Sequence, residues 1–139
     1  MGQISVNVSL PAAADEVWQV VKDFGGASRW LPGIDSLKMT GSGVGAVRTV
    51  TYKDGSQAVE RLESLSDDSR SLSFAILESS LPVEGYVGSL TVRDLGPRGC
   101  EVEWYSTFGP KGATESEVTQ MLEKSHRLAL GNLQKSLKR

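Results

Sequence analysis

Residues 43–64 read GVGAVRTVTYKDGSQAVERLES, and this stretch decides the architecture of the chain. On both sides of Lys53-Asp54-Gly55, apolar and β-branched residues alternate with polar ones. A period of two around a glycine-containing turn predicts a β-hairpin.

Two pairings of this hairpin compete. A two-residue Asp-Gly turn places Arg48 opposite Arg61, so that like charges face each other and both faces mix apolar with charged residues. A three-residue loop with Gly55 in the left-handed conformation pairs Arg48 with Glu60 and gives one mostly apolar and one mostly polar face. Because a slip of one residue moves every side chain to the other face, the cleaner pattern favours the three-residue loop.

The same period of two extends along most of the chain. The segment ISVNVSL (4–10) predicts a first strand with one buried face. Further strands are predicted at 34–40, 44–53, 57–65, 70–78, 86–94 and 99–109, each ending at a cluster of Gly, Pro, Asp or Ser. We expect their inward residues to be Leu72, Phe74, Ile76, Tyr86, Gly88, Leu90, Val92, Cys100, Val102, Trp104 and Phe108.

Helical spacing occurs at two places. Residues 12–24 predict a helix that Gly25-Gly26 ends, and residues 27–31 predict a second short one. A long helix is expected over about 115–137, with Thr114 and Glu117 as a capping box. Its apolar stripe is predicted to hold Val118, Met121, Leu122, Ser125, Leu128, Ala129, Leu133 and Leu137. The predicted fold is therefore one α+β domain over 1–139, with a seven-stranded antiparallel sheet, two short helices after the first strand and a long C-terminal helix on one face.

Composition excludes several classes of protein. The 139 residues carry 15 basic and 17 acidic side chains without a basic cluster, so we expect no nucleic acid and no membrane partner. One cysteine and one histidine exclude a disulfide framework and a multi-histidine metal centre. The start MGQISV has no cationic and apolar leader pattern, so we expect a cytoplasmic protein, either a monomer or a homodimer.

The predicted pairing puts Arg48 and Glu60 side by side on the apolar face of the sheet. One interpretation is a structural ion pair near the rim of the sheet. The other is a cavity site, in which Glu60 moves a proton and Arg48 binds an anionic or polarised oxygen. Tyr86 also points inward, either as a core tyrosine or as a hydroxyl of the same cavity.

Other signals have simpler interpretations. The run Gly41 to Ala46 satisfies G-x-G-x-x-A, but a predicted strand follows it, so a hairpin turn is expected instead of a dinucleotide site. His126 falls near the edge of the last helix's apolar stripe and is expected at the surface or rim, with a histidine in the pocket as the less favoured alternative. Cys100 is expected to be a small core residue. Trp30 suits either a cavity mouth or the core.

Four segments resemble the polyketide cyclase/dehydrase branch of the SRPBCC (START-like) superfamily, and together they cover nearly the whole chain. They are SVNVSLPAAADEVWQVVKDFGGASRWLPGIDSL, GVGAVRTVTY, ILESSLPVEGYVGSLTV and EVEWYSTF. The resemblance implies a helix-grip fold, with a cavity for a small, mostly apolar molecule between the sheet and the last helix. Within the family the segments are similar to the lachrymatory-factor synthases, plant enzymes that rearrange a small sulfenic acid without metal or cofactor.

The resemblance also implies roles for individual residues. The catalytic Arg of that group matches Arg48 in GAVRTV, and its catalytic Glu matches Glu60 in AVERL. A pocket Tyr matches Tyr86 in VEGY, and a Trp matches Trp104 in VEWY. The loop 79–83 resembles the gate loop of related hormone receptors, although a rigid turn packed on the helix fits it equally.

The resulting function hypothesis is a cofactor-independent cyclase/dehydrase or isomerase. The alternative is a non-catalytic carrier or sensor of a hydrophobic metabolite. Arg48, Glu60 and Tyr86 are the expected catalytic residues, and no metal or cofactor is expected. The expected substrate-binding residues are Trp30, Phe74, Leu81, Pro82, Trp104 and Leu122.

Overall fold

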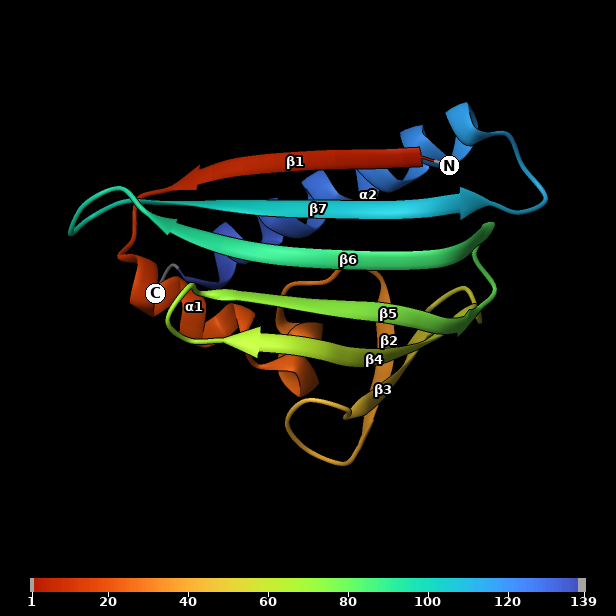
Figure 1. Ribbon diagram of the computed structural model, residues 1–139, viewed down its shortest axis with the longest axis horizontal. Helices are drawn as coiled ribbons and strands as arrows, with labels where there is room; N and C mark the ends of the chain where they lie inside the picture. Colours follow the sequence, from red (N-terminus) through yellow and green to blue (C-terminus); the bar gives the residue numbers. More distant parts are fainter. Residues whose placement is uncertain (1, 138–139) are drawn as a thin grey trace.

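Seven strands form one antiparallel sheet in the computed structural model, which describes residues 2–137. The strands are β1 Gly2–Leu10, β2 Ile34–Thr40, β3 Val47–Tyr52, β4 Gln57–Ser66, β5 Ser71–Ser79, β6 Val83–Asp94 and β7 Cys100–Pro110. Their spatial order is β1-β7-β6-β5-β4-β3-β2 (Figure 1). Each strand from β2 to β7 pairs with its neighbour in sequence, and β1 closes onto β7.

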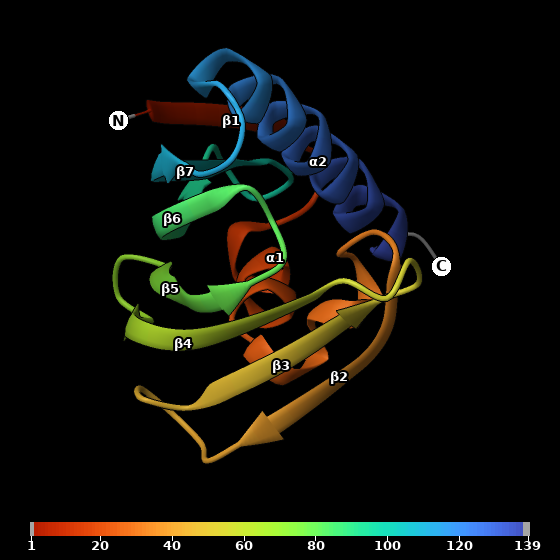
Figure 2. The ribbon, with the colours of Figure 1, turned by 90° about the vertical axis from the view of Figure 1, so that its right-hand side faces the viewer.

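Three helical segments accompany the sheet: α1 Ala14–Val21, the 3₁₀ helix η1 Phe24–Arg29 and α2 Glu115–Ser136. The sheet curves, and α2 crosses its concave side while α1 and η1 lie inside the curve (Figure 2). The predicted capping box is confirmed, because Thr114 and Glu117 bond each other's backbone N–H groups. No helix within residues 2–137 is long and apolar enough to span a membrane.

The predicted register of the central hairpin is confirmed. Arg48 pairs with Glu60 and Val50 with Ala58 between β3 and β4. The loop closes with Tyr52 N–H donating to the Ser56 carbonyl, and Gly55 has φ of 90°. Only glycine adopts this left-handed conformation without strain, which is why the three-residue loop forms here.

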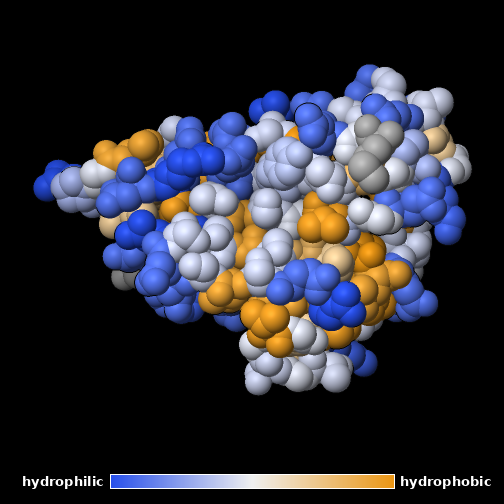
Figure 3. Space-filling view, viewed as in Figure 1, coloured by the Kyte–Doolittle hydropathy of each residue, from blue (hydrophilic) through white to orange (hydrophobic). Residues whose placement is uncertain are grey.

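The sheet and α2 bury a continuous apolar core on the concave side. Most of the predicted inward residues of β5, β6 and β7 belong to it, including Phe74, Leu90 and Phe108. The opposite face of the sheet is turned toward solvent, and Figure 3 shows that polar side chains cover much of it. The alternation that the sequence displays therefore separates a buried from a solvated face.

Three details differ from the prediction. The first helix ends at Val21, and Gly25 and Gly26 lie inside η1 instead of terminating α1. This turn is tight, because a Cβ on Gly26 would collide with the Asp23 carboxylate. Strand β3 starts at Val47, since the glycines before it have positive φ and form a loop.

The buried stripe of α2 is also rotated from the predicted one. Leu128 is exposed, whereas His126 and Leu130 are buried. Residues 122, 126, 129, 130 and 133 follow helical spacing on one face, and position 128 points away from it.

Candidate functional site

The β3–β4 hairpin places an ion pair on the concave face of the sheet. Arg48 Nε and Nη2 both lie 2.7 Å from Glu60 Oε1. Each residue is only 5% exposed. The structure therefore brings these two side chains together on the apolar face, as the hairpin register predicts.

Arg48 is held further by the 3₁₀ helix. Its Nη1 donates to the Phe24 carbonyl at 3.0 Å, and its guanidinium lies 3.8 Å from the centre of the Phe24 ring. The two hydrogen bonds, to Glu60 and to the Phe24 carbonyl, use two of the five N–H donors of a guanidinium. Glu60 Oε2 takes part in no hydrogen bond among residues 2–137. The pair therefore keeps hydrogen-bonding capacity on both partners.

A second polar cluster is built around the Tyr86 hydroxyl. Ser106 Oγ lies 2.7 Å from Tyr86 Oη, and His126 Nε2 lies 3.1 Å from it. The Trp104 indole N–H donates to the same oxygen at 3.2 Å. Since β6, β7 and α2 each contribute, this cluster forms only when the helix packs on the sheet.

Burial keeps this cluster uncharged. The Trp104 and His126 rings stack with centroids 3.9 Å apart and planes inclined by 9°. Burial lowers the pKa of His126 to about 3, so its imidazole is neutral at physiological pH. Burial also raises the pKa of the Tyr86 phenol, outweighing the opposing hydrogen bonds from Ser106 and Trp104, so the hydroxyl stays protonated.

Both clusters border a cavity of about 70 Å³, called here the inner chamber. Arg48 and Glu60 lie on its wall from β3 and β4, and Tyr86 and His126 from β6 and α2. The remaining lining is mostly apolar: Leu31, Pro32, Tyr52, Phe74, Ile76, Leu81, Trp104, Leu122 and Ser125.

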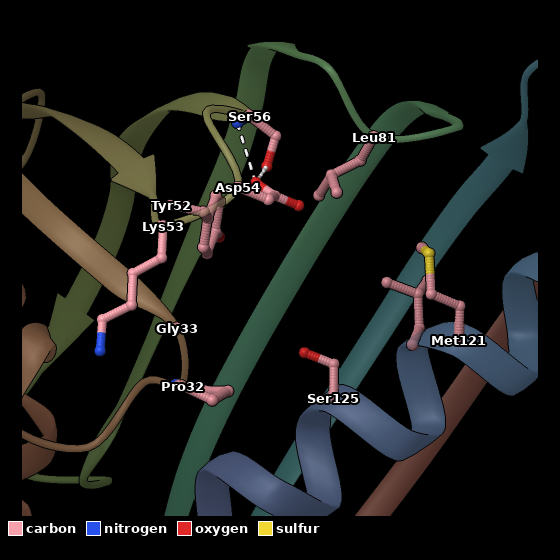
Figure 4. Close-up of a pocket in the computed structure, with 10 residues that line it drawn as sticks. Pro32, Gly33, Tyr52, Lys53, Asp54, Ser56, Leu81, Met121 and Ser125 are labelled. Carbon is pink, nitrogen blue, oxygen red and sulfur yellow. Dashed lines mark hydrogen bonds between the residues drawn. The ribbon is translucent and has the colours of Figure 1, made fainter.

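A larger cavity of about 380 Å³, the outer chamber, adjoins the inner one and opens toward solvent. Tyr52 and Asp54 of the β3–β4 turn lie on one side of it, opposite Met121 and Ser125 of α2, with Leu81 above (Figure 4). The two chambers share the lining residues Pro32, Tyr52, Leu81, Leu122 and Ser125.

Most, but not all, of the predicted site residues lie at these chambers. Arg48, Glu60, Tyr86, Phe74 and Trp104 line the inner chamber, and Leu81 and Leu122 line both. Trp30 and Pro82 line neither. Trp30 is buried behind Trp104, edge-on with ring centroids 5.9 Å apart, and the Pro82 carbonyl accepts a bond from Lys111 N–H.

Sequence reasoning missed three polar residues of the site. The expectation that His126 lies at the surface or rim is wrong, since this residue is 3% exposed and faces the sheet. Its spacing of four residues from both Leu122 and Leu130 was the available signal. Ser106 lies between the inward Trp104 and Phe108 with the same period of two. Tyr52 lies on the same face of β3 as Arg48. Burial is the main cause that raises the pKa of Tyr52 to about 12.

No group of three or more His, Cys, Asp or Glu side chains suited to a metal ion occurs in the part of the chain that the structure describes. Cys100 is fully buried, as expected for a small core residue, and burial raises the pKa of its thiol. The glycine-rich run before β3 leads into a strand, as predicted, instead of the helix that a dinucleotide site requires.

The curved sheet, the long helix and the chambers between them define a helix-grip protein. The whole chain, over residues 1–138, matches the family described as polyketide cyclase/dehydrase and lipid transport. The protein belongs to this family, which is of the SRPBCC type that its segments indicate.

Solved structures show the same fold. The XoxI protein from Bacillus cereus is 28% identical, with a TM-score of 0.90 over 98% of this chain and 95% of that one. Two enzymes share only the fold at lower identity. Zhui aromatase/cyclase from Streptomyces sp. R1128 is 18% identical, with a TM-score of 0.78 over 97% and 90% of the two chains. Norcoclaurine synthase from Thalictrum flavum, in complex with dopamine and hydroxybenzaldehyde, is 21% identical, with a TM-score of 0.74 over 96% and 84%.

Proposed function

We propose that the protein binds a small, mostly apolar molecule in the two chambers and catalyses a cofactor-independent cyclase/dehydrase- or isomerase-type reaction on it by proton transfer. Glu60 accepts or donates the proton through Oε2. Arg48 uses its uncommitted N–H groups to hold an oxygen on which negative charge develops. Tyr86 anchors a polar group of the same molecule.

The observation that carries this proposal is the incompletely bonded ion pair on the wall of the inner chamber. A buried carboxylate with both oxygens fully bonded would be typical of a structural role. Glu60 instead has one oxygen without a hydrogen bond among the described residues, and it lines the inner chamber. A dry, apolar surrounding strengthens the electrostatic interactions between such groups and a ligand.

A carrier or sensor is the second candidate, and the outer chamber favours it. At about 380 Å³, this chamber is within the range of small-molecule pockets. Apolar Pro32, Leu81, Met121 and Leu122 are prominent in its lining. The family description also includes lipid transport. In this alternative, Arg48 and Glu60 orient the ligand without reacting with it.

Glu60→Gln separates the two candidates, because it preserves shape and removes the ionisable oxygen. A metabolite extract of the source organism is incubated with the wild type, with this variant and with Glu63→Gln, and is then analysed by untargeted mass spectrometry. Glu63 is the matched control, since it lies three residues away on the outer face of the same strand and pairs with Arg61 in solvent. We expect a compound that the wild type and Glu63→Gln consume and Glu60→Gln spares.

Other outcomes contradict the enzyme proposal in distinct ways. A compound that all three proteins retain unchanged would establish a carrier or sensor. A compound consumed equally by all three would show that Glu60 does not move the proton. Absence of both consumption and retention would remove the support for a ligand cavity.

A further inference from the structure

The hydrogen atoms around the Tyr86 hydroxyl can be arranged in only a few ways. Trp104 Nε1–H is a donor only, so Tyr86 Oη must accept from it. The two hydroxyls of Tyr86 and Ser106, 2.7 Å apart, share one O–H···O bond. His126 Nε2 lies within reach of both oxygens. The tautomer of His126 therefore decides where the remaining hydrogens point.

With the proton on Nδ1, the hydrogen bonds form a closed chain. Either Tyr86 O–H donates to Ser106 and Ser106 O–H donates to His126 Nε2, or Ser106 O–H donates to Tyr86 and Tyr86 O–H donates to His126 Nε2. Both hydroxyl hydrogens are then used within the protein, and Tyr86 has none to offer to a ligand. The proton on Nδ1 has no acceptor, because this buried atom has no partner in the part of the chain that is described.

With the proton on Nε2, the direction of the chain reverses. His126 Nε2–H donates to Ser106 Oγ, Ser106 O–H donates to Tyr86 Oη, and Tyr86 Oη also accepts from Trp104. Both lone pairs of Tyr86 are then occupied, and its own hydrogen is free. Because Tyr86 lines the inner chamber, a ligand there can accept that hydrogen.

Two observations favour the proton on Nε2. The distances from Nε2 to Tyr86 Oη and Ser106 Oγ are 3.1 and 3.2 Å, within the range of N–H···O bonds, and Ser106 Oγ has a lone pair available to accept from Nε2–H. Nδ1, which has no partner among the described residues, is then an acceptor that receives no hydrogen bond. In buried backbone groups an orphaned N–H is rarer than an under-satisfied acceptor, and the same preference applies to the ring.

We propose that His126 is a positioning residue that, as the Nε2–H tautomer, turns the Tyr86 hydroxyl toward the inner chamber, so that the ligand presents an acceptor oxygen there. The part concerning the ligand rests on the proposed function, and the tautomer does not. The Tyr86 hydroxyl is consequently a donor to the ligand, on the opposite side of its network from Ser106.

The tautomer can be measured in the wild-type protein alone. The chain has one histidine, so ¹⁵N labelling of histidine gives one ring system in long-range ¹H–¹⁵N correlation spectra. At pH 7 we expect a protonated Nε2 and an unprotonated Nδ1. The reverse pattern, or a doubly protonated ring, overturns the positioning role without touching the proposed function.

The acceptor preference can be measured with two probes of the same shape. Acetophenone carries a carbonyl oxygen where α-methylstyrene carries a CH₂ group. We expect the wild type to bind the ketone about two- to tenfold more tightly, as one net hydrogen bond allows. Tyr86→Phe should lose this preference, His126→Leu should lose it as well, and His126→Gln should retain it because its amide N–H can replace Nε2–H.

Two results overturn the ligand part of the proposal. An unchanged preference in Tyr86→Phe would assign the ketone oxygen to Arg48 instead. Failure of both probes to enter the protein, read from the absence of shifts at His126 and Trp104, would contradict the proposed function as well.

Discussion

Arg48 Nε–H donates to Glu60 Oε1 at 2.7 Å, and Arg48 Nη2 lies 2.7 Å from the same oxygen as an ion-pair contact. When an arginine and a carboxylate serve only to bond each other, the guanidinium commonly donates to both carboxylate oxygens. Here the second oxygen has no hydrogen bond within residues 2–137, although the pair is almost entirely buried. Because burial of charge is costly unless bonding is complete, this arrangement suits a binding site better than a stabilising contact.

Arg48→Met should destabilise the fold by about 3–5 kcal/mol, because it leaves the Glu60 carboxylate buried without its partner. The double variant Arg48→Met/Glu60→Leu should recover most of that loss, since it replaces both charges with apolar groups of similar size. Urea unfolding of the wild type, both single variants and the double variant gives the coupling between the residues. A double variant as unstable as Arg48→Met would contradict this account.

The hairpin could be predicted from the sequence because its information is local. The spacing of Arg48, Gly55 and Glu60 selects one register out of two, and the alternation of apolar residues selects the buried face. The capping box of α2 is equally local, since its members Thr114 and Glu117 are three residues apart. In the hairpin and in the capping box, the residues that interact are the same nearby residues whose spacing predicts the structure.

The second cluster could not be predicted in the same way. His126, Tyr86 and Ser106 meet only after α2 has packed across the sheet, and nothing in their separate segments fixes the rotation of that helix. A polar histidine among apolar residues also weakens the apolar pattern of the helix. The predicted buried stripe therefore included Leu128 and left out His126. Trp30, expected to bind substrate, is instead buried edge-on against Trp104 and lines neither chamber.

Stability should fall between pH 7 and pH 5 because of His126. The folded state keeps this imidazole neutral down to about pH 3, whereas the unfolded chain takes up a proton near pH 6.5. The unfolded state therefore binds more protons across this window, and stability decreases as the pH falls from 6.5 toward 3. The expected loss between pH 7 and pH 5 is about 2 kcal/mol.

His126→Gln is the control for this prediction, since it removes the only histidine and keeps an amide donor at the site. Denaturant midpoints of the variant should change little between pH 7 and pH 5, above the range in which most carboxylates titrate. Equal pH dependence in the wild type and the variant would contradict the assignment of the effect to His126.

Ser125→Trp should close the outer chamber without unfolding the protein. Ser125 is exposed on α2 and faces the opening between the helix and the β3–β4 turn (Figure 4). An indole there fills space that is otherwise open, so we expect a stability change below about 1 kcal/mol. Binding of acetophenone, followed by NMR shifts, should weaken at least about tenfold.

Lys124→Trp is the matched control for ligand entry, because Lys124 is exposed on the same helix and lines neither chamber. It should bind the probe as the wild type does. Equal binding by Ser125→Trp and the wild type would show that molecules reach the inner chamber by another route.

Gly88→Ala should disturb the site from β6, the strand that also carries Tyr86. A Cβ at this position of β6 would lie 2.9 Å from Phe74 Cζ and 3.0 Å from Tyr86 Oη, closer than packed side chains tolerate. Both rings are buried and cannot move freely, so we expect a loss of about 1–3 kcal/mol together with altered His126 NMR signals.

Gly131→Ala is the contrasting control: its Cβ would meet nothing within 4 Å, and removing a helical glycine should stabilise the protein by about 0.5–1 kcal/mol. If Gly88→Ala were neutral and left the His126 signals unchanged, the close approach of Phe74 and Tyr86 over this glycine would not be what holds the Tyr86 hydroxyl in place.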